Sequence, residues 1–262
     1  MNPVGRALMK LTILGSGTLI PFPNRGNSGY FLQTEKHTIL IDGGSGALRR
    51  IADYHLDYKN IDTICYTHLH PDHIIDFIPL LFAYKHDPSV EIPKSLKIIA
   101  PKGFQTYYHQ IMDIYGKWVL PDVGLNIEIE EVFRDEIDLE GLEIICNHTE
   151  HTEYSVTYRF TENSGNSLFY SGDTDYCEEL VQSAKNVDVL MLECSFPDEQ
   201  KRPGHLTPSE CGKIATETKC GRLILTHFYP EVLEIDILST VSKYYSGMVD
   251  LAYDGMEVFI DA

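Results

Sequence analysis

The stretch Thr67-His68-Leu69-His70-Pro71-Asp72-His73 carries three imidazoles and a carboxylate within its last six residues. A mostly apolar run over residues 61–66 leads directly into it, as expected of a buried strand that ends in polar side chains. His68 and His70 are two positions apart, so in an extended chain both imidazoles leave the same face. A strand that delivers several ligands to its own carboxyl end predicts a metal site there.

The residues that follow these two histidines extend the predicted site. Pro71 ends the strand, and Asp72 and His73 can then turn toward a second position beside the first. Neutral imidazole and carboxylate together suit zinc, manganese or iron better than calcium or magnesium. A polar turn that contains histidines by chance is the alternative, but the spacing after an apolar strand favours metal binding.

The composition is that of a folded, water-soluble protein. The chain has 262 residues, of which 43% are hydrophobic and 23% charged. No apolar run approaches the roughly 20 residues of a membrane span, and the first ten residues lack the apolar segment of a signal peptide. The six cysteines are scattered without a Cys-x-x-Cys pair, which favours reduced thiols. We therefore expect a cytoplasmic protein with no membrane segment.

The net charge bears on the substrate. Asp and Glu outnumber Lys and Arg by 39 to 21, which gives a formal charge of −18. Proteins that grip long polyanions usually contact the phosphates through a basic face. The balance therefore argues against a long nucleic acid held over a wide surface and favours a small substrate.

Apolar runs separated by turn residues predict a single α/β domain over residues 1–262, with two sheets covered on the outside by helices. Strands are expected over residues 10–17, 30–34, 38–41, 61–67, 96–100, 125–133, 142–147, 155–161, 168–171, 189–193, 222–226, 249–253 and 256–260. Helices are expected over residues 47–58, 74–86, 103–120, 177–185 and 236–245, and from Thr207, where Glu210 completes a capping box.

Two features leave alternatives open. Asp42, beside two glycines at the end of a predicted strand, is either a turn residue or a carboxylate that orients a ligand histidine. The predicted helix over residues 103–120 is rich in aromatic side chains, which either pack in the core or overhang a pocket.

Three later segments repeat the pattern of a strand followed by polar residues. They cover residues 147–152, 170–174 and 225–228. A single metal ion with four ligands would not need them all, but two metals that share one carboxylate would. Asp173, directly after Gly172, is suited to act as the shared ligand.

These motifs resemble those of the metallo-β-lactamase-fold hydrolases, and within them the ribonuclease Z-like branch. The histidine-rich stretch is similar to the superfamily signature, and Ser171-Gly172-Asp173-Thr174 is similar to its bridging-aspartate motif. Residues 10–17, 21–30 and 39–43 also resemble the ribonuclease Z amino terminus, so the likeness spans nearly the whole chain.

The resemblance implies an αββα sandwich with two metal ions at one edge, zinc in the first place and manganese or iron as alternatives. The implied ligands are His68, His70 and His151 for the first metal, Asp72, His73 and His227 for the second, and Asp173 between them. His151 is preferred to His148 because the family places its third histidine seven residues before a Tyr-Arg pair, here Tyr158-Arg159.

The same branch has a glutamate in a strand-end motif and a later histidine, and Glu193 and His205 fit those positions. The resemblance implies that His205, supported by Glu193, protonates the leaving group. It also implies that Asp72 orients the nucleophile as well as binding metal. A histidine that merely flanks the helix at Thr207 is the alternative for His205.

One departure from the family concerns the substrate. Ribonuclease Z enzymes that process tRNA carry a long arm between the third histidine and the bridging aspartate, and the segment from His151 to Asp173 is too short for it. We therefore expect a phosphodiesterase for a small phosphodiester or short nucleotide, with tRNA disfavoured. The alternatives are a lactone or thioester hydrolase and a non-hydrolytic redox or binding protein. Analogy with the fold suggests a homodimer.

Overall fold

The first four strands of the chain bury both of their faces. The computed structural model describes residues 9–120 and 124–261. In β2 (Gly29–Gln33), Tyr30 and Leu32 lie in the core between two sheets, whereas Phe31 packs with the helices on the outer side. Side chains that alternate between two buried faces are expected of a sheet covered on both sides.

The first sheet has seven strands in the order β14-β1-β2-β3-β4-β5-β6. Its first four strands are antiparallel neighbours, and β3 to β6 run parallel. The last strand of the chain forms one edge of this sheet and pairs with its first strand, with Ile260 opposite Met9. The remaining bounds are β1 (Met9–Gly15), β3 (Thr38–Gly43), β4 (Thr63–Cys65), β5 (Lys94–Pro101), β6 (Leu125–Val132) and β14 (Glu257–Ile260).

The second sheet has the order β13-β12-β11-β10-β9-β8-β7 and repeats this scheme of pairing. Strands β7 to β10 form an antiparallel meander, and β10 to β13 run parallel. The bounds are β7 (Asp135–Leu139), β8 (Leu142–His148), β9 (Val156–Glu162), β10 (Ser167–Tyr170), β11 (Val189–Glu193), β12 (Arg222–Thr226) and β13 (Met248–Leu251).

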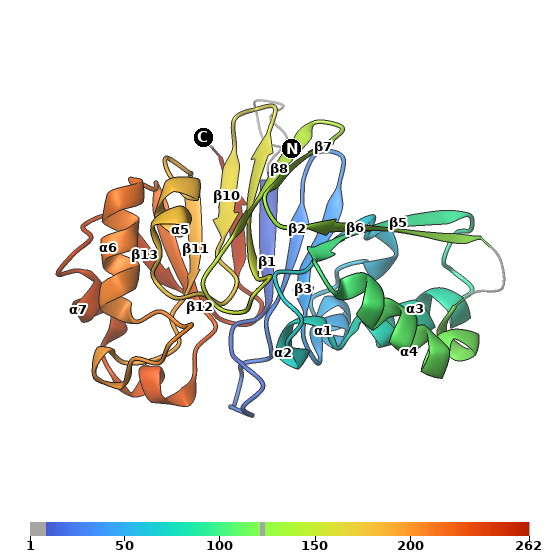
Figure 1. The fold of residues 1–262 in the computed structure, drawn as a ribbon, viewed down its shortest axis with the longest axis horizontal. Coiled ribbons are helices and arrows are strands. Elements are labelled where there is room, and N and C mark those ends of the chain that lie inside the picture. The colour runs from blue at the N-terminus through green and yellow to red at the C-terminus, as the bar shows by residue number, and fades with distance from the viewer. Residues whose placement is uncertain (1–8, 121–123, 262) are drawn as a thin grey trace.

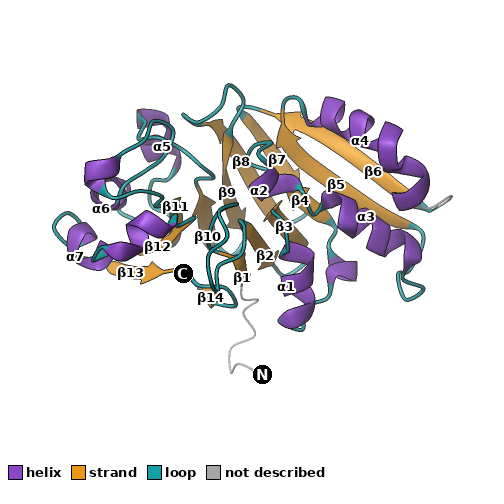
Figure 2. Ribbon diagram, turned by 90° about the horizontal axis from the view of Figure 1, so that it is seen from below, coloured by secondary structure: helices purple, strands orange, loops and turns teal. Residues whose placement is uncertain are grey.

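The helices lie outside the two sheets, which confirms the predicted αββα sandwich. Seen from below, α5, α6 and α7 lie on one side of the strands and α1, α3 and α4 on the other, with α2 between the two groups (Figures 1 and 2). The helices are α1 (Ala47–Asp53), α2 (Pro71–Ile74), α3 (Phe77–His86), α4 (Phe104–Val119), α5 (Glu178–Ser183), α6 (Pro208–Thr218) and α7 (Ile237–Val241). Three 3-10 turns are η1 (Tyr58–Asn60), η2 (Asp198–Gln200) and η3 (Pro230–Glu234).

Several predicted elements have the predicted bounds and others do not. Strands β11 and β12 match the predicted ranges, and Thr207 and Glu210 form the predicted capping box at α6. The helix predicted over residues 47–58 is wrong beyond Asp53, because His55 adopts a left-handed conformation and a 3-10 turn follows. The last helix is also shorter than the predicted range 236–245.

Two further corrections concern segments around the site. The strand predicted over residues 61–67 is assigned only at Thr63–Cys65, so the histidines follow the strand in a loop. The helix predicted over residues 74–86 begins later, at Phe77 (α3), and the separate helix α2 ends at Ile74. Asp76 lies between the two helices, and its carboxylate accepts hydrogen bonds from the N–H groups of Gly46 and Leu48 (3.1 and 2.8 Å). Because the side chain of Asp76 is bound to the start of α1, it fixes the position of α2.

The aromatic side chains at the two ends of α4 differ in burial. Phe104 is buried and packs on Tyr66 and Phe77, with ring centroids 5.1 and 5.6 Å apart. At the other end of the helix, Tyr115 and Trp118 are exposed. The core interpretation is therefore correct for the amino-terminal end of α4 and wrong for its carboxyl-terminal end.

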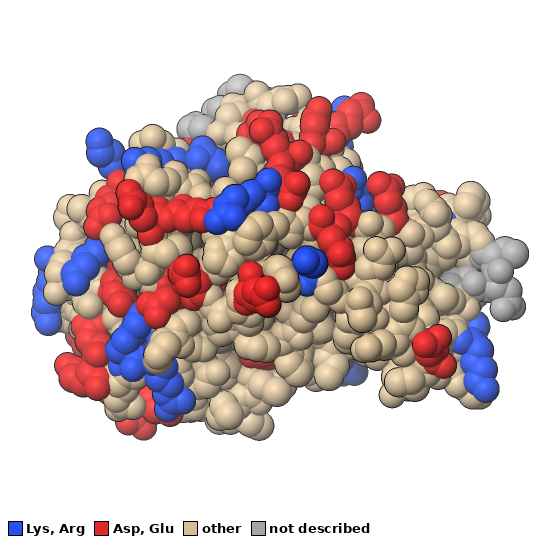
Figure 3. Space-filling view, viewed as in Figure 1, with Lys and Arg blue, Asp and Glu red and all other residues tan. Residues whose placement is uncertain are grey.

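The surface carries carboxylates and basic groups side by side, and Figure 3 shows no continuous basic face on the side in view. The area over α3 and α4, at the lower right, is mostly uncharged in this view. Among the described residues, no helix combines the length and apolar character needed to cross a membrane.

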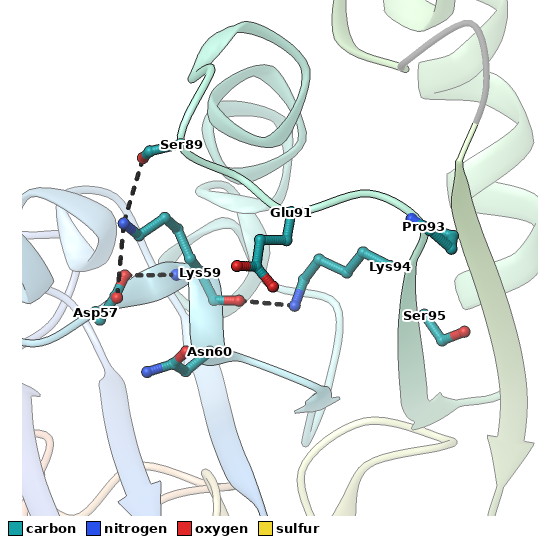
Figure 4. Close-up of a pocket in the computed structure, with 8 residues that line it drawn as sticks. All are labelled: Asp57, Lys59, Asn60, Ser89, Glu91, Pro93, Lys94 and Ser95. Carbon is teal, nitrogen blue, oxygen red and sulfur yellow. Dashed lines mark hydrogen bonds and ion pairs between the residues drawn. The ribbon is translucent and has the colours of Figure 1, made fainter.

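A cavity of about 460 Å³ lies at the amino ends of β4 and β5, at the opposite end of β4 from the predicted ligands (Figure 4). Both of its lysines are engaged within the protein. Lys94 Nζ donates to the backbone carbonyl of Lys59 (2.8 Å), and Lys59 Nζ donates to Ser89 Oγ (3.2 Å).

The role of Asp76 gives a prediction for stability. Replacing Asp76 with Ala leaves the first N–H groups of α1 without their acceptor, so the free energy of unfolding should fall by about 1–3 kcal/mol. Urea denaturation measures this change. Asp53→Ala, at the exposed end of the same helix, is the control and should change the free energy by less than about 1 kcal/mol. Equal effects of the two substitutions would contradict the role of Asp76.

Candidate metal centre

The predicted ligands meet at one edge of the sandwich because each follows the carboxyl end of a strand. His68 and His70 lie in the loop after β4, and Asp72 and His73 lie on α2. Pro71 occupies the first position of α2, where its fixed φ is suited to a helix start, rather than directly ending a strand. The loops after β8, β10 and β12 contribute His151, Asp173 and His227, respectively.

The first group consists of His68, His70, His151 and Asp173, with one potential ligand atom from each residue within 4.8 Å of the others. His70 Nδ1 lies 3.0 Å from His68 Nε2 and 3.2 Å from His151 Nε2. Asp173 Oδ2 is 3.8 Å from both Nε2 atoms. Three imidazoles thus converge on one oxygen of the aspartate.

The second group consists of Asp72, His73 and His227. Asp72 Oδ2 lies 3.5 Å from His227 Nε2 and 4.0 Å from His73 Nε2. The other oxygen of Asp173, Oδ1, lies 3.4 and 3.3 Å from the same two nitrogens. The two oxygens of Asp173 therefore face different groups of histidines.

The residues present fit a divalent metal ion. His73 Nε2, His227 Nε2 and Asp173 Oδ1 are buried, and none of them has a hydrogen-bond partner among the described residues. A buried polar atom without a partner costs about 1–3 kcal/mol, so three such atoms converging on one place indicate that they bind something there. Imidazole nitrogen and carboxylate oxygen are the donor types that zinc and similar transition metals prefer.

Hydrogen bonds on the far side of the rings aim the histidines inward. His73 Nδ1 donates to Asp42 Oδ2 (2.8 Å), and His151 Nδ1 donates to the carbonyl oxygen of Gly204 (2.8 Å). Because Nδ1 faces an acceptor in both contacts, Nε2 is the nitrogen directed at the centre, where it can bind a metal ion in its deprotonated form.

Asp42 connects the two groups of histidines. It accepts hydrogen bonds from the Thr67 backbone N–H (2.8 Å) and hydroxyl, from Tyr170 Oη (3.0 Å) and from His73. The Thr67 hydroxyl in turn accepts from His68 Nδ1 (3.1 Å). Of the two alternatives for Asp42, these contacts support the carboxylate that orients histidines.

Burial and neighbouring charges set the protonation of the group. Burial and nearby histidines lower the pKa values of His68 and His70, so both rings are neutral near pH 7. Burial alone would raise the pKa of Asp72 and Asp173, but the neighbouring histidines outweigh it. The pKa of Asp72 is lowered to about 2 and that of Asp173 lies well below its usual value. Both carboxylates are therefore ionised and able to bind a cation.

The structure places His151, and not His148, with the other histidines. The ring of His148 packs on Phe133, with centroids 4.9 Å apart, and His148 belongs to neither group. Gly204, with a φ of +81°, allows its carbonyl to approach His151, because a Cβ there would lie 3.0 Å from His151 Nδ1. The sequence analysis did not single out Gly204 as part of the site.

Glu193 and His205 also meet at this edge. His205 Nδ1 donates to Glu193 Oε1 (2.9 Å), and the Ser195 hydroxyl donates to Glu193 Oε2 (2.5 Å). Ser195 also accepts from His227 Nδ1 (3.0 Å), so one carboxylate is linked to two histidines. Burial alone would lower the pKa of His205, but the hydrogen bond and charge of Glu193 outweigh it and raise the pKa.

Ser195 and Tyr229 are two residues of the site that the sequence analysis missed. The Tyr229 ring lies 5.9 Å from the ring of His205 and 5.8 Å from that of His227. Burial and the carboxylates of Asp173, Asp72 and Glu193 raise its pKa to about 12. A tyrosine and a serine next to a predicted ligand segment carry no spacing signal, so the sequence alone could not identify them.

Comparison with known proteins assigns the chain to a family. A sequence model of the beta-lactamase superfamily domain matches residues 37–228. The uncharacterized protein Rv1339 of Mycobacterium tuberculosis is 31% identical over 247 residues, which cover 92% of this chain and 88% of that protein. The probable metallo-hydrolase YhfI of Bacillus subtilis is 26% identical over 262 residues, with 94% and 98% covered. A ribonuclease Z of Archaeoglobus fulgidus is 24% identical over 274 residues, with 84% and 87% covered.

Solved structures show the same fold. The crystal structure of YhfI from B. subtilis superposes with a TM-score of 0.82 at 26% identity, covering 97% of this chain and 100% of that one. The short form of human tRNase Z has a TM-score of 0.79 at 23% identity, with 97% and 100% covered. A diphosphatase of the PhnP family has a TM-score of 0.73 at 22% identity, with 97% of each chain covered. The chain belongs to the metallo-β-lactamase-fold hydrolases, in the branch that includes ribonuclease Z.

Proposed function

We propose that this protein is a phosphodiesterase that uses two metal ions to hydrolyse small phosphodiesters. The arrangement of Asp173 carries the proposal, because its two oxygens face two separate groups of histidines. One carboxylate placed in this way suits a ligand shared between two cations.

Each cation has its own set of protein ligands in this proposal. His68, His70 and His151 hold the first, Asp72, His73 and His227 hold the second, and Asp173 contributes one oxygen to each. Zinc is the first expectation, because histidine and carboxylate ligands are typical of it, and manganese or iron are the alternatives.

The chain supplies groups for both ends of the reaction. When bound, two divalent cations supply positive charge to phosphoryl oxygens and lower the pKa of water at the site. Asp72, with its pKa near 2, stays ionised at neutral pH and can accept a hydrogen bond from the attacking water. It therefore orients the nucleophile in addition to binding metal.

His205 is the proposed general acid. Because Glu193 occupies Nδ1, the proton available to the substrate is that on Nε2. The raised pKa of His205 favours the cationic ring near neutral pH, which is the form that can protonate a leaving alkoxide. A carbonyl substrate has less need of such a pair, so Glu193 and His205 favour the phosphodiester over a lactone or thioester.

The segment between His151 and Asp173 supports a small substrate. It consists of the β9–β10 hairpin and short turns, without an additional arm. A cavity of about 460 Å³ beside His151 is lined partly by Glu150, Glu153 and Asp175. Such a rim disfavours a polyanion such as tRNA. A diester carries a single negative charge at the reacting group and is compatible with it.

The comparisons support chemistry at phosphorus. Two of the similar proteins are named as a ribonuclease Z and a diphosphatase. Both names describe cleavage of bonds to phosphate, which is the reaction class proposed for this protein.

Hydrolysis of bis(p-nitrophenyl) phosphate by zinc- and manganese-loaded protein tests the function, with a small lactone assayed in parallel. The proposal expects diester cleavage and no turnover of the lactone. Turnover of the lactone alone would transfer the function to carbonyl hydrolysis. Absence of both activities would favour a redox or binding role.

Removal of the shared carboxylate should abolish the centre. Asp173→Ala should lose metal and diesterase activity together, because both sets of histidines lose a common ligand. Elemental analysis after dialysis should fall from about two metal ions per chain to fewer than one. His148→Ala is the matched control for metal binding, since His148 lies outside both groups, and it should retain its metal content. An active, metal-loaded Asp173→Ala protein would contradict the assignment.

Removal of the general acid should act on the rate and not on the metals. His205→Ala should keep its metal content but lose about 10²–10⁴-fold in kcat on diesters with an alkoxide leaving group. The loss should be much smaller with p-nitrophenolate, which leaves without protonation. A loss that does not depend on the leaving group would show that His205 does not donate the proton.

A further inference from the structure

We propose that Tyr229 is a substrate-binding residue, whose phenol donates a hydrogen bond to a non-bridging oxygen of the phosphodiester. This inference rests on the proposed function, since it concerns the same site. It assigns a role to a residue that is absent from the predicted ligand and acid–base sets.

The backbone on both sides of Tyr229 is fixed. His227 adopts a left-handed conformation, with φ of +55°, which turns the chain away from β12. Phe228 is buried beneath the guanidinium of Arg25, and its N–H donates to the carbonyl oxygen of Ser16 (3.0 Å). Pro230 then starts η3. Tyr229 is therefore anchored between a buried residue and a proline.

Neighbouring rings hold the Tyr229 ring in place. It stacks on Phe196, with centroids 4.5 Å apart and an interplanar angle of 29°. Phe196 is itself buried and carries the guanidinium of Arg202 at 4.2 Å from its centroid. The rings of His205 and His227 meet Tyr229 at 72° and 75°. The Tyr229 ring thus makes T-shaped contacts with the ring of the proposed general acid, His205, and with that of a proposed metal ligand, His227.

The hydroxyl of Tyr229 is available to a ligand. Within residues 9–120 and 124–261, no hydrogen bond to it is present, whereas Tyr30 Oη pairs with Thr226 Oγ1 (2.9 Å) and Tyr158 Oη donates to the carbonyl oxygen of Tyr66 (2.8 Å). The ring contacts with His205 and His227, at centroid distances of 5.9 and 5.8 Å, place Tyr229 beside the centre. A phenol O–H in this position can donate a hydrogen bond to a bound ligand.

The cationic side chains in this region are already engaged by the protein. Arg25 donates to Ser16 Oγ (2.7 Å), and Lys201 lies between Asp175 (2.7 Å) and Glu210 (2.5 Å). Arg202 packs on Phe196. Arg202 also lies 3.7 Å from Glu231, with 56% of its side chain exposed. A phosphoryl oxygen in the site can therefore meet the neutral donor of Tyr229 in addition to this guanidinium.

Tyr229→Phe tests the proposal, because phenylalanine keeps the stack on Phe196 and removes only the hydroxyl. Metal content and melting temperature should match the parent, and kcat/KM on bis(p-nitrophenyl) phosphate should fall about 10- to 100-fold. Tyr253→Phe, which removes an exposed hydroxyl, is the matched control and should leave kcat/KM unchanged. Parental activity of Tyr229→Phe would overturn the proposal.

A phosphorothioate diester distinguishes a substrate contact from a structural effect. Sulfur is a weak hydrogen-bond acceptor, so with the two stereoisomers of methyl p-nitrophenyl phosphorothioate the penalty of Tyr229→Phe should disappear for one isomer and persist for the other. An equal penalty on the phosphate and on both isomers would indicate a structural effect and overturn the proposal.

A binding measurement distinguishes failure of this inference from failure of the proposed function. Diethyl phosphate binding to the zinc-loaded protein, measured by calorimetry, should weaken about tenfold in Tyr229→Phe. If the parent hydrolyses no diester but binds diethyl phosphate more tightly than Tyr229→Phe does, the proposed function fails while the Tyr229 contact stands. Equal binding by the parent and Tyr229→Phe would overturn the contact. If the parent binds no diester at all, both are overturned.

Discussion

The centre depends on one buried carboxylate, that of Asp173, held where two groups of imidazoles meet. A carboxylate buried at this depth is stable only with compensating charge or hydrogen bonds. The histidines on either side provide part of this compensation and lower its pKa, yet Oδ1 has no hydrogen-bond partner among the described residues. A bound cation would supply further stabilisation, and the surrounding histidines are oriented to hold one.

The scaffold orients these histidines through two further carboxylates. Asp42 holds His73 directly and His68 through the Thr67 hydroxyl, and Glu193 holds His205 directly and His227 through Ser195. Asp42 lies at the carboxyl end of β3 in one sheet and Glu193 at the carboxyl end of β11 in the other, at the same edge of the sandwich. Because both sheets repeat one order of antiparallel and parallel pairing, the polar residues that follow several strands meet at that edge.

The sequence could predict the residues that carry local signals. The histidine spacing, the polar residues after apolar runs and the Thr207–Glu210 capping box are all encoded within a few positions. The structure brings the predicted ligands together and forms the predicted capping box. Features that depend on distant contacts could not be predicted. The pairing of β14 with β1 joins the two ends of the chain, and β7 was missed because Ile137 is its only buried residue. The place of Ser195, Gly204 and Tyr229 in the site depends on contacts with distant segments, so it can be recognised only in the structure.

A crystal structure of the zinc-loaded protein, with anomalous scattering recorded at the zinc edge, tests the central claim most directly. The account predicts two peaks about 3.5–4 Å apart, one on each side of the Asp173 carboxylate and each within bonding distance of one group of histidines. A single peak that engages both groups, or zinc bound elsewhere while the Asp173 oxygens are hydrogen-bonded to the protein, would contradict it.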